Sequence, residues 1–359
     1  MDDARKERLN AYAHLATMGL MLACAYEATP FVLGEGETPQ LQLGERIGRS
    51  VDRLAWVPIS ACASALPFIA EASKRIPRTV GIPRLCRGSW VVPIGRTVRG
   101  RWVYHDFGGV VPHSIVAGST KFGKTAFIRT VLYTLCHQQP YDRLQVLIID
   151  LKGGASFDPW RWLSHVLDVK RTLEEAESAL ADAEAEMWRR LDAIREARMK
   201  FQPDPVFPRL FVVIDEGMVL ADSKEALKRL RSIASIGREP HVHLIYGTQR
   251  PSHEILPVTT RDQMEARFVF HLNEAGSSEV VLGEKNQAAF TLKARPGRMI
   301  YRGTDGLCEL QASYVASDVI DTWLRESACV GMPSVLDTTA RNHGTYAVSK
   351  SPDRLSDWD

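Results

Sequence analysis

One segment of the chain combines glycines, a lysine and a threonine at a spacing suited to holding phosphate groups. Residues 118–125 read GSTKFGKT, which fits the pattern G-x-x-x-x-G-K-[ST]. Glycine lets backbone N–H groups curl around a phosphate where a Cβ would clash. Lys124 would place its ammonium group against the β- and γ-phosphates, and the Thr125 hydroxyl would bind Mg²⁺. We therefore predict a site for ATP and Mg²⁺ that is formed by Gly118, Ser119, Thr120, Lys121, Phe122, Gly123, Lys124, Thr125 and Ala126.

Two acidic residues follow an apolar run further along the chain. Residues 211–214 read FVVI and precede Asp215 and Glu216. At the end of a buried strand, Asp215 would help to hold Mg²⁺ and Glu216 would polarise the attacking water. Such a pair can also cap a helix. Its place after a phosphate-binding segment, on a parallel strand, favours an ATP-hydrolysing enzyme over a switch that only binds nucleotide.

Three further residues are candidates for the same chemistry. Gln249 ends the run YGTQ and would sense the γ-phosphate or the attacking water, although a plain strand-to-loop turn reads the same way. Charge on the transferred phosphoryl group also calls for a cation from a neighbouring subunit. Arg238 and Arg267 are the two candidates, each with a surface salt bridge as the alternative, and the sequence does not rank them.

Short apolar runs alternate with helical patterns over most of the chain, which predicts an α/β fold. The runs lie at residues 90–94, 102–105, 114–117, 146–149, 210–214, 242–246 and 266–271. A long helix is expected over 172–200, where Thr172 and Glu175 form a capping box. This pattern predicts a P-loop NTPase (RecA-like) parallel sheet flanked by helices. We expect a small helical N-terminal region at 1–88, an ATPase motor at 89–325 and a polar tail at 326–359.

Composition narrows the function classes. The 359 residues carry a formal net charge of +2, so any contact with nucleic acid must come from local loops or a pore lining. The six cysteines form no C-x-x-C pair, which disfavours a zinc site or a disulfide framework and favours a reducing cytosol. His241 and His243 precede an apolar strand and fit core or strand-edge histidines better than metal ligands.

Two apolar stretches near the N-terminus, residues 11–33 and 54–70, bear on membrane association. A membrane helix needs roughly 20 largely apolar residues, and prolines interrupt both stretches. They form either a weak membrane hairpin or helices packed on the motor or on a neighbouring subunit. The mixed-charge residues 1–10 do not fit a cleavable signal peptide. We expect a cytoplasmic protein, at the inner face of the cell membrane if the hairpin forms.

Several motifs resemble the FtsK/SpoIIIE family of DNA translocases, in the HerA–FtsK branch of P-loop ATPases. They are VPIG at 92–95, PHSIVAG at 112–118, DLKGG at 150–154 and, most specifically, HLIYGTQRPS at 243–252. The GSTKFGKT and DLKGG runs look most like TcpA-like coupling proteins of conjugative plasmids and integrative elements. The resemblance implies a homo-hexameric ring that threads double-stranded DNA and contacts its phosphates through pore-loop Lys and Arg. Few residues follow the motor, so we expect no winged-helix module that reads oriented DNA sequences.

The resemblance leaves the biological role open between several classes. The leading hypothesis is an ATP-driven translocase of double-stranded DNA for a mobile element, with a relaxase in conjugation or a replication protein as its partner. A replicative DNA helicase and the ATPase of a protein-secretion system are the alternatives. A nucleotide-dependent scaffold would not need the full set of catalytic residues.

Overall fold

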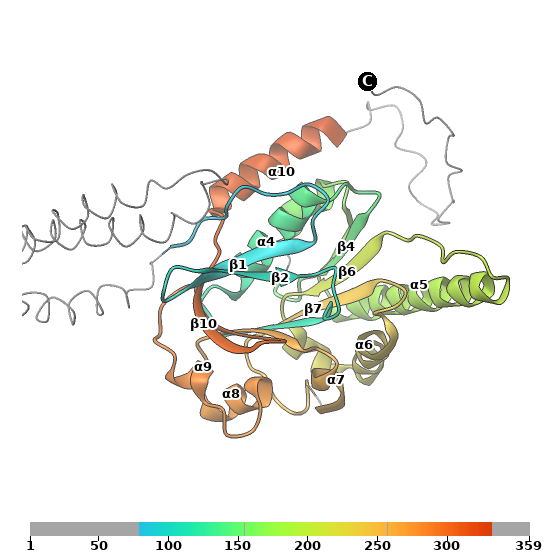
Figure 1. Ribbon diagram of the computed structural model, residues 1–359. Helices are drawn as coiled ribbons and strands as arrows, with labels where there is room; N and C mark the ends of the chain where they lie inside the picture. Colours follow the sequence, from blue (N-terminus) through green and yellow to red (C-terminus); the bar gives the residue numbers. More distant parts are fainter. Residues whose placement is uncertain (1–78, 154, 257, 332–359) are drawn as a thin grey trace, which may run out of the picture. The chain divides into compact units, whose positions relative to one another are not determined.

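The alternating strands and helices fold into a mixed, largely parallel sheet with helices on both faces (Figure 1). The computed structural model describes residues 79–153, 155–256 and 258–331. Its strands are β1 (Val91–Thr97), β2 (Trp102–Asp106), β3 (Ser114–Ala117), β4 (Leu144–Ile149), β5 (Val166–Lys170), β6 (Arg209–Ile214), β7 (Val242–Thr248), β8 (Ala266–Phe270), β9 (Arg298–Gly303) and β10 (Gly306–Ala312). Its helices are α4 (Lys124–Gln138), α5 (Leu173–Met199), α6 (Lys224–Ile236), α7 (Val258–Asp262), α8 (Ala275–Leu282), α9 (Ala288–Thr291) and α10 (Ser317–Gly331), with 3₁₀ turns η2 (Asp158–Trp162) and η3 (Gly217–Asp222).

The sheet has the strand order β2-β1-β10-β9-β8-β3-β7-β6-β4-β5. From β8 through β3, β7, β6 and β4 to β5 all neighbours run parallel, as the sequence predicted. Beyond β8 the pairing changes, because β9 and β10 form an antiparallel hairpin on that side. The central strands are mainly apolar because helices cover them on both faces. All four residues of β3 and all seven of β7 are buried.

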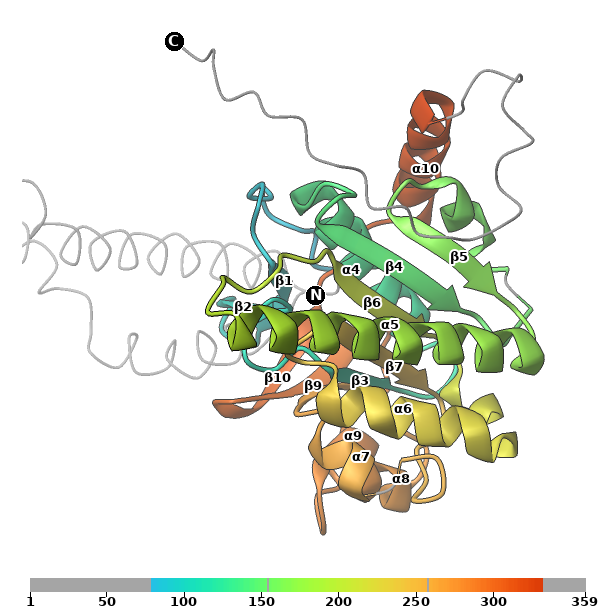
Figure 2. The same cartoon turned by 90° about the vertical axis from the view of Figure 1, so that its right-hand side faces the viewer.

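Helices α5 and α6 lie side by side over one face of the sheet (Figure 2). Their apolar stripes, including Leu180, Met187 and Leu230, join a core with the sheet residues Val212 and Leu244. The predicted capping box starts α5: the Thr172 hydroxyl accepts a hydrogen bond from the Glu175 N–H, and the Glu175 carboxylate accepts one from the Thr172 N–H. The cap supplies partners for N–H groups that the first helical turn leaves unpaired.

Helices α4 and α10 lie on the other side of the sheet (Figure 1). The ring of Phe127 in α4 packs 5.0 Å, centroid to centroid, from that of Phe268 in β8. Trp323 of α10 contacts His137 of α4 and Trp160 of η2, with ring centroids 4.6 Å and 5.9 Å away. These aromatic contacts hold α10 on the sheet domain, and the boundary expected at 325/326 lies within this helix.

The described residues divide into two units: the sheet domain, and the tip of the first hairpin, Arg96–Val103. In the tip, the Gly100 N–H donates to the Thr97 carbonyl and Thr97 donates to the Arg101 carbonyl, each at 2.9 Å. Gly100 takes the left-handed conformation that such a turn favours, with φ of 75°. The strands predicted on either side of Gly100 are thus present.

Both apolar stretches of the N-terminal region, and most of the polar tail, lie outside the described residues. Within the described part of the chain, no helix is long and apolar enough to cross a bilayer.

Candidate active site

The predicted site residues meet at one edge of the sheet, where the parallel strands have their carboxyl ends. Strand β3 leads into the phosphate-binding segment, β6 into Asp215 and Glu216, and β7 into Gln249. Strand β7 lies between β3 and β6, so Gln249 emerges between the phosphate-binding segment and the two acidic residues. The crevice outside the carboxyl ends of parallel strands is where open α/β sheets bind ligands.

The phosphate-binding segment is suspended between the ends of β7 and β8. The Gly118 N–H donates to the Thr248 carbonyl at 3.2 Å, and the Ser119 N–H donates to the His271 carbonyl at 3.0 Å. A Cβ on Gly118 would lie 2.6 Å from the Cβ of Phe270, so a larger residue would push the segment off the sheet. This close approach is the reason why glycine is needed at the start of the segment.

Helix α4 presents an uncapped N-terminus to this segment. Its N-cap is Gly123, in the left-handed region with φ of 108°, and this residue brings no side chain to occupy the first N–H groups. The first turn of this described helix also contains no acidic residue. The free N–H groups and the partial positive charge of the helix end therefore favour an anion at this place.

Lys124, Thr125 and Asp215 form a closed group at the same edge. The Lys124 ammonium lies 2.7 Å from Oδ1 of Asp215, and both side chains are buried, with 4% and 1% exposed. The Thr125 hydroxyl lies 2.9 Å from Oδ2 of Asp215. A hydroxyl and a carboxylate that share one small space are the oxygen donors that Mg²⁺ prefers, so Thr125 and Asp215 fit the predicted metal site.

Glu216 is held by two neighbouring strands. Its Oε2 lies 3.0 Å from the Lys152 ammonium, and its Oε1 accepts a hydrogen bond from the Gln249 N–H at 3.3 Å. The side-chain amide oxygen of Gln249 accepts a 2.7 Å hydrogen bond from the Thr120 hydroxyl. Gln249 thus connects the phosphate-binding segment to Glu216, which is the arrangement a γ-phosphate sensor needs.

Two residues of this edge were not among the predicted site residues: Asp150 and Lys152, which follow β4. Asp150 is 1% exposed, and its carboxylate accepts the Lys152 N–H at 3.2 Å. Burial, together with the nearby negative charge of Asp215, raises the pKa of the Asp150 carboxyl. The signal that could have found both was the DLKGG run, because it ends a strand that neighbours β6.

The two arginines considered for a trans-acting role have different environments. Arg267 is 4% exposed, and its guanidinium donates to the carbonyls of Met264, Val281 and Arg261 at 3.2, 2.6 and 3.1 Å. Burial, with nearby arginines, lowers its pKa to about 10. These contacts tie Arg267 to its own subunit. Arg238 is exposed and precedes β7, at the edge of the sheet opposite the phosphate-binding segment.

The histidines of the H-x-H pair have the strand-edge and core environments that the sequence favoured, His241 just before β7 and His243 within it. His243 is 1% exposed within β7, and its ring lies 3.2 Å from the Arg209 guanidinium. Burial lowers the pKa of His243 well below its ordinary value. Arg209 also approaches the ring of His241, at 3.3 Å. A cation between the two rings is incompatible with a metal site there.

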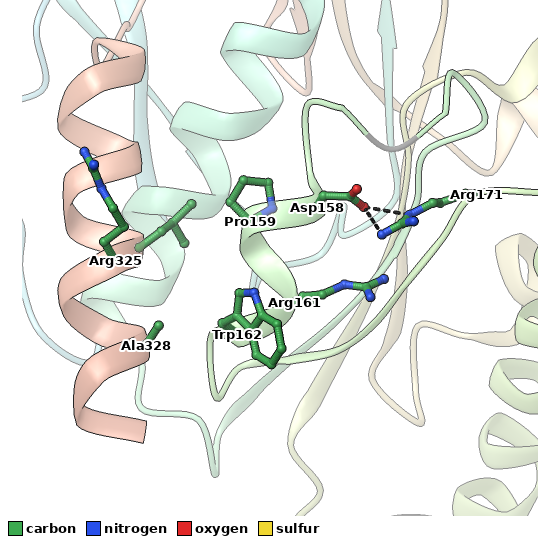
Figure 3. Close-up of a pocket in the computed structure, with 8 residues that line it drawn as sticks. Asp158, Pro159, Arg161, Trp162, Arg171, Arg325 and Ala328 are labelled. Carbon is green, nitrogen blue, oxygen red and sulfur yellow. Dashed lines mark hydrogen bonds and ion pairs between the residues drawn. The ribbon is translucent and has the colours of Figure 1, made fainter. Parts of the chain in front are cut away.

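A separate cavity of about 480 Å³ lies between η2 and α10 (Figure 3). Pro159, Trp162, Leu324 and Ala328 give it an apolar lining, and an Arg171–Asp158 ion pair of 2.7 Å closes one side. The space beside the phosphate-binding segment is smaller, about 140 Å³, but Ser119, Thr120, Gln249 and Arg250 line it. Chemistry on phosphates is therefore assigned to the smaller, polar space.

The chain is similar in sequence to known proteins. Residues 84–204 match the family model described as FtsK/SpoIIIE family. The ESX secretion system protein EccC of Thermomonospora curvata is 31% identical over 268 residues, which cover 68% of this chain and 20% of the relative. The DNA translocase FtsK of Helicobacter pylori is 31% identical over 225 residues, which cover 58% of this chain and 26% of the relative. The chain thus spans about a fifth to a quarter of the length of these relatives.

Two solved structures share the fold. The pCW3 conjugation coupling protein TcpA, in a monomer form with ATPγS, superposes with a TM-score of 0.60 at 22% identity, covering 71% of this chain and 75% of that one. The cytoplasmic domain of the type VII secretion ATPase EccC of Thermomonospora curvata gives 0.58 at 26% identity, covering 71% and 33%. At 22% identity the TcpA match is a likeness of fold alone.

Proposed function

The chain is an FtsK-type P-loop ATPase, and we propose that it hydrolyses ATP to move double-stranded DNA through a homo-hexameric ring. One observation carries the proposal: the phosphate-binding segment, Lys124, Asp215, Glu216 and Gln249 converge at one edge of the sheet. A protein that only binds nucleotide has no need of Glu216 beside the phosphate site. The matched relatives include both DNA translocases and secretion system proteins, so the choice of DNA as the transported molecule is part of the proposal.

In the proposed reaction the residues have separate tasks. The N–H groups at the start of α4 and the Lys124 ammonium bind the β- and γ-phosphates. Mg²⁺, held by Thr125 and Asp215, would neutralise charge on the phosphate oxygens. Glu216 accepts the proton of the water that attacks the γ-phosphorus, while the bond to the β,γ-bridging oxygen breaks and ADP leaves. Arg238 of a neighbouring subunit is our proposed source of the additional cation.

Gln249 would connect the state of the phosphates to movement. Its side chain is bonded to Thr120 in the phosphate-binding segment, and its own N–H is bonded to Glu216. A change at the γ-phosphate position therefore alters both contacts of one residue at the end of β7. The loop that follows β7 would carry that change toward the DNA.

Double-stranded DNA is the cargo that we favour, because the HLIYGTQRPS run at 243–252 is shared in pattern with DNA translocases. Conjugative transfer or replication of a mobile element is the proposed setting, supported by the TcpA-like GSTKFGKT and DLKGG runs. A relaxase or a replication protein would be the partner, and the protein would act in the cytoplasm or at the inner face of the membrane. The second candidate is a protein-secretion ATPase, which the similarity to EccC supports.

The experiment that tests the proposal measures ATP turnover of the full chain with and without linear duplex DNA. We expect duplex DNA to raise kcat, and Glu216→Gln to bind ATP but lose at least about 100-fold in kcat. Glu225→Gln, at an exposed glutamate in the first turn of α6, is the matched control and should stay near wild type. Normal turnover in Glu216→Gln would overturn the catalytic assignment. Turnover that ignores duplex DNA would overturn DNA as the cargo and favour the secretion candidate.

A further inference from the structure

Lys152 lies outside the phosphate-binding segment, yet its ammonium is 3.0 Å from Oε2 of Glu216. The register of the sheet brings the two residues together. Strands β4 and β6 pair in parallel with Ile149 opposite Ile214, so the chain segments that carry Lys152 and Glu216 leave the sheet side by side. The contact therefore follows from the sheet register rather than from a chance approach of two surface side chains.

The two partners of this ion pair differ in burial. The Glu216 side chain is 5% exposed, whereas that of Lys152 is 40% exposed. A buried carboxylate without a nearby cation is costly, because it loses its water and gains no opposite charge. Lys152 thus stabilises the negative charge that a general base must carry, while its own stem lies on the surface.

Lys152 also favours one direction of the Glu216 carboxylate. Oε2 lies within ion-pair distance of the Lys152 ammonium after β4, and Oε1 accepts a hydrogen bond from the Gln249 N–H after β7. The ion pair and the hydrogen bond come from two different strands and act on different oxygens, so together they favour one orientation of the carboxylate. Since a base acts only when it lies within hydrogen-bond reach of its water, this direction matters for turnover.

We infer that Lys152 is a positioning residue for Glu216, through which the loop after β4 controls the rate of ATP hydrolysis. The inference rests on the proposed role of Glu216 as the base. The loop is suited to this control, because Lys152, Gly153 and Ala155 are exposed and Gly153 takes a left-handed turn with φ of 87°. A partner that contacts the exposed Lys152 would act on the ammonium that pairs with the base.

The test compares ATP turnover of full-length Lys152→Met, Lys152→Arg and a matched control. Lys152→Met keeps the aliphatic stem and removes the charge. We expect a roughly 10- to 100-fold lower kcat with the KM for ATP within about 3-fold of wild type, and Lys152→Arg should restore most of the loss. The control is Lys170→Met, at the end of the neighbouring strand β5, which removes a similar ion pair of 2.6 Å with Asp168 and should leave kcat unchanged.

Glu216→Gln, measured in parallel, separates the role of Lys152 from the role of Glu216 as the base. If Lys152 acts through Glu216, the double variant Lys152→Met/Glu216→Gln loses no more activity than Glu216→Gln alone. Full additivity of the two losses, or a normal kcat in Lys152→Met beside an inactive Glu216→Gln, would overturn the role of Lys152 only. Normal turnover in Glu216→Gln would remove the base itself, and the inference with it. A loss in Lys152→Met that Lys152→Arg does not rescue would reduce the residue to a packing role.

Discussion

The pairing of Lys124 with Asp215 makes a prediction that does not depend on activity. The two groups are 2.7 Å apart and almost fully buried. Each has lost its contact with water, and the opposite charge of the other offsets that loss. Removing one partner leaves an uncompensated buried charge, which costs about 3–5 kcal/mol of unfolding free energy. Lys124→Met and Asp215→Asn should each show a loss of this order when ATP is absent.

The double variant distinguishes pairing from general damage. With both charges gone, neither is stranded, so the loss should fall short of the sum of the single losses by about 2–3 kcal/mol. Urea unfolding of the full chain, followed by circular dichroism, measures the unfolding free energy of the wild type, the two single variants and the double variant. The half-buried pair Lys170–Asp168, with side chains 27% and 47% exposed, is the comparison, and its expected coupling is only about 0.2–1 kcal/mol. Single losses at Lys124 and Asp215 that add within about 0.5 kcal/mol would refute the pairing.

Three further predictions concern stability and the trans-acting cation. Thr172→Ala removes the cap of α5 and should cost about 1 kcal/mol in urea unfolding; an unchanged midpoint would contradict the capping box. Arg267→Met leaves three backbone carbonyls without the guanidinium donor and should lower the urea midpoint of unfolding. Arg238→Ala should lower kcat and leave stability unchanged. The opposite result for the two variants would mean that Arg267, and not Arg238, is the trans-acting cation. Burial lowers the pKa of His113 from 6.5 to about 4. As the pH falls, the unfolded chain therefore binds a proton at His113 before the folded chain does, and the stability present above pH 6.5 is lost as the pH falls toward 4. At pH 5 this loss of unfolding free energy is about 2 kcal/mol. The difference in unfolding free energy between pH 7 and pH 5 should therefore be smaller by about this amount in His113→Gln. The same pH dependence in the variant and the wild type would contradict the burial of His113.

The sequence was most informative where one local pattern served one structural need. The run at 114–117 is apolar after Ser114 because β3 is covered on both faces, and its predicted bounds match the strand. Thr172 and Glu175 mark the start of α5 because a helix end needs partners for its free N–H groups. Similarly, the glycines of the phosphate-binding segment reflect close backbone approaches, such as that of Gly118 to Phe270.

Prediction failed where an element depends on its neighbours for burial. Strand β5 lies at the edge of the sheet and buries only Val166 and Val169, and the hairpin of β9 and β10 mixes polar with apolar positions. None of these three has the continuous apolar run that identified the central strands. β5 pairs with β4, and β9 pairs with β8 and β10, so the partner strands define these elements rather than a local apolar run.

The same reason explains the site residues that the sequence did not supply. Lys152 meets Glu216 only through the register of β4 against β6, which a single sequence does not reveal. The sequence offered Arg267 as a trans-acting cation or a surface salt bridge, whereas the carbonyls that surround it come from the chain before and after β8. The residue types thus predicted the chemistry of this site, whereas the contacts between its residues are seen only in the folded structure.

Displacement of a third strand from a DNA triplex tests the central claim most directly, because it requires movement along duplex DNA rather than turnover alone. The full chain with ATP should release the labelled third strand from a long duplex, and Glu216→Gln with ATP should not. Release should also fail when the duplex beside the triplex is too short for the protein to load. Steady ATP hydrolysis without any strand release would contradict translocation of double-stranded DNA.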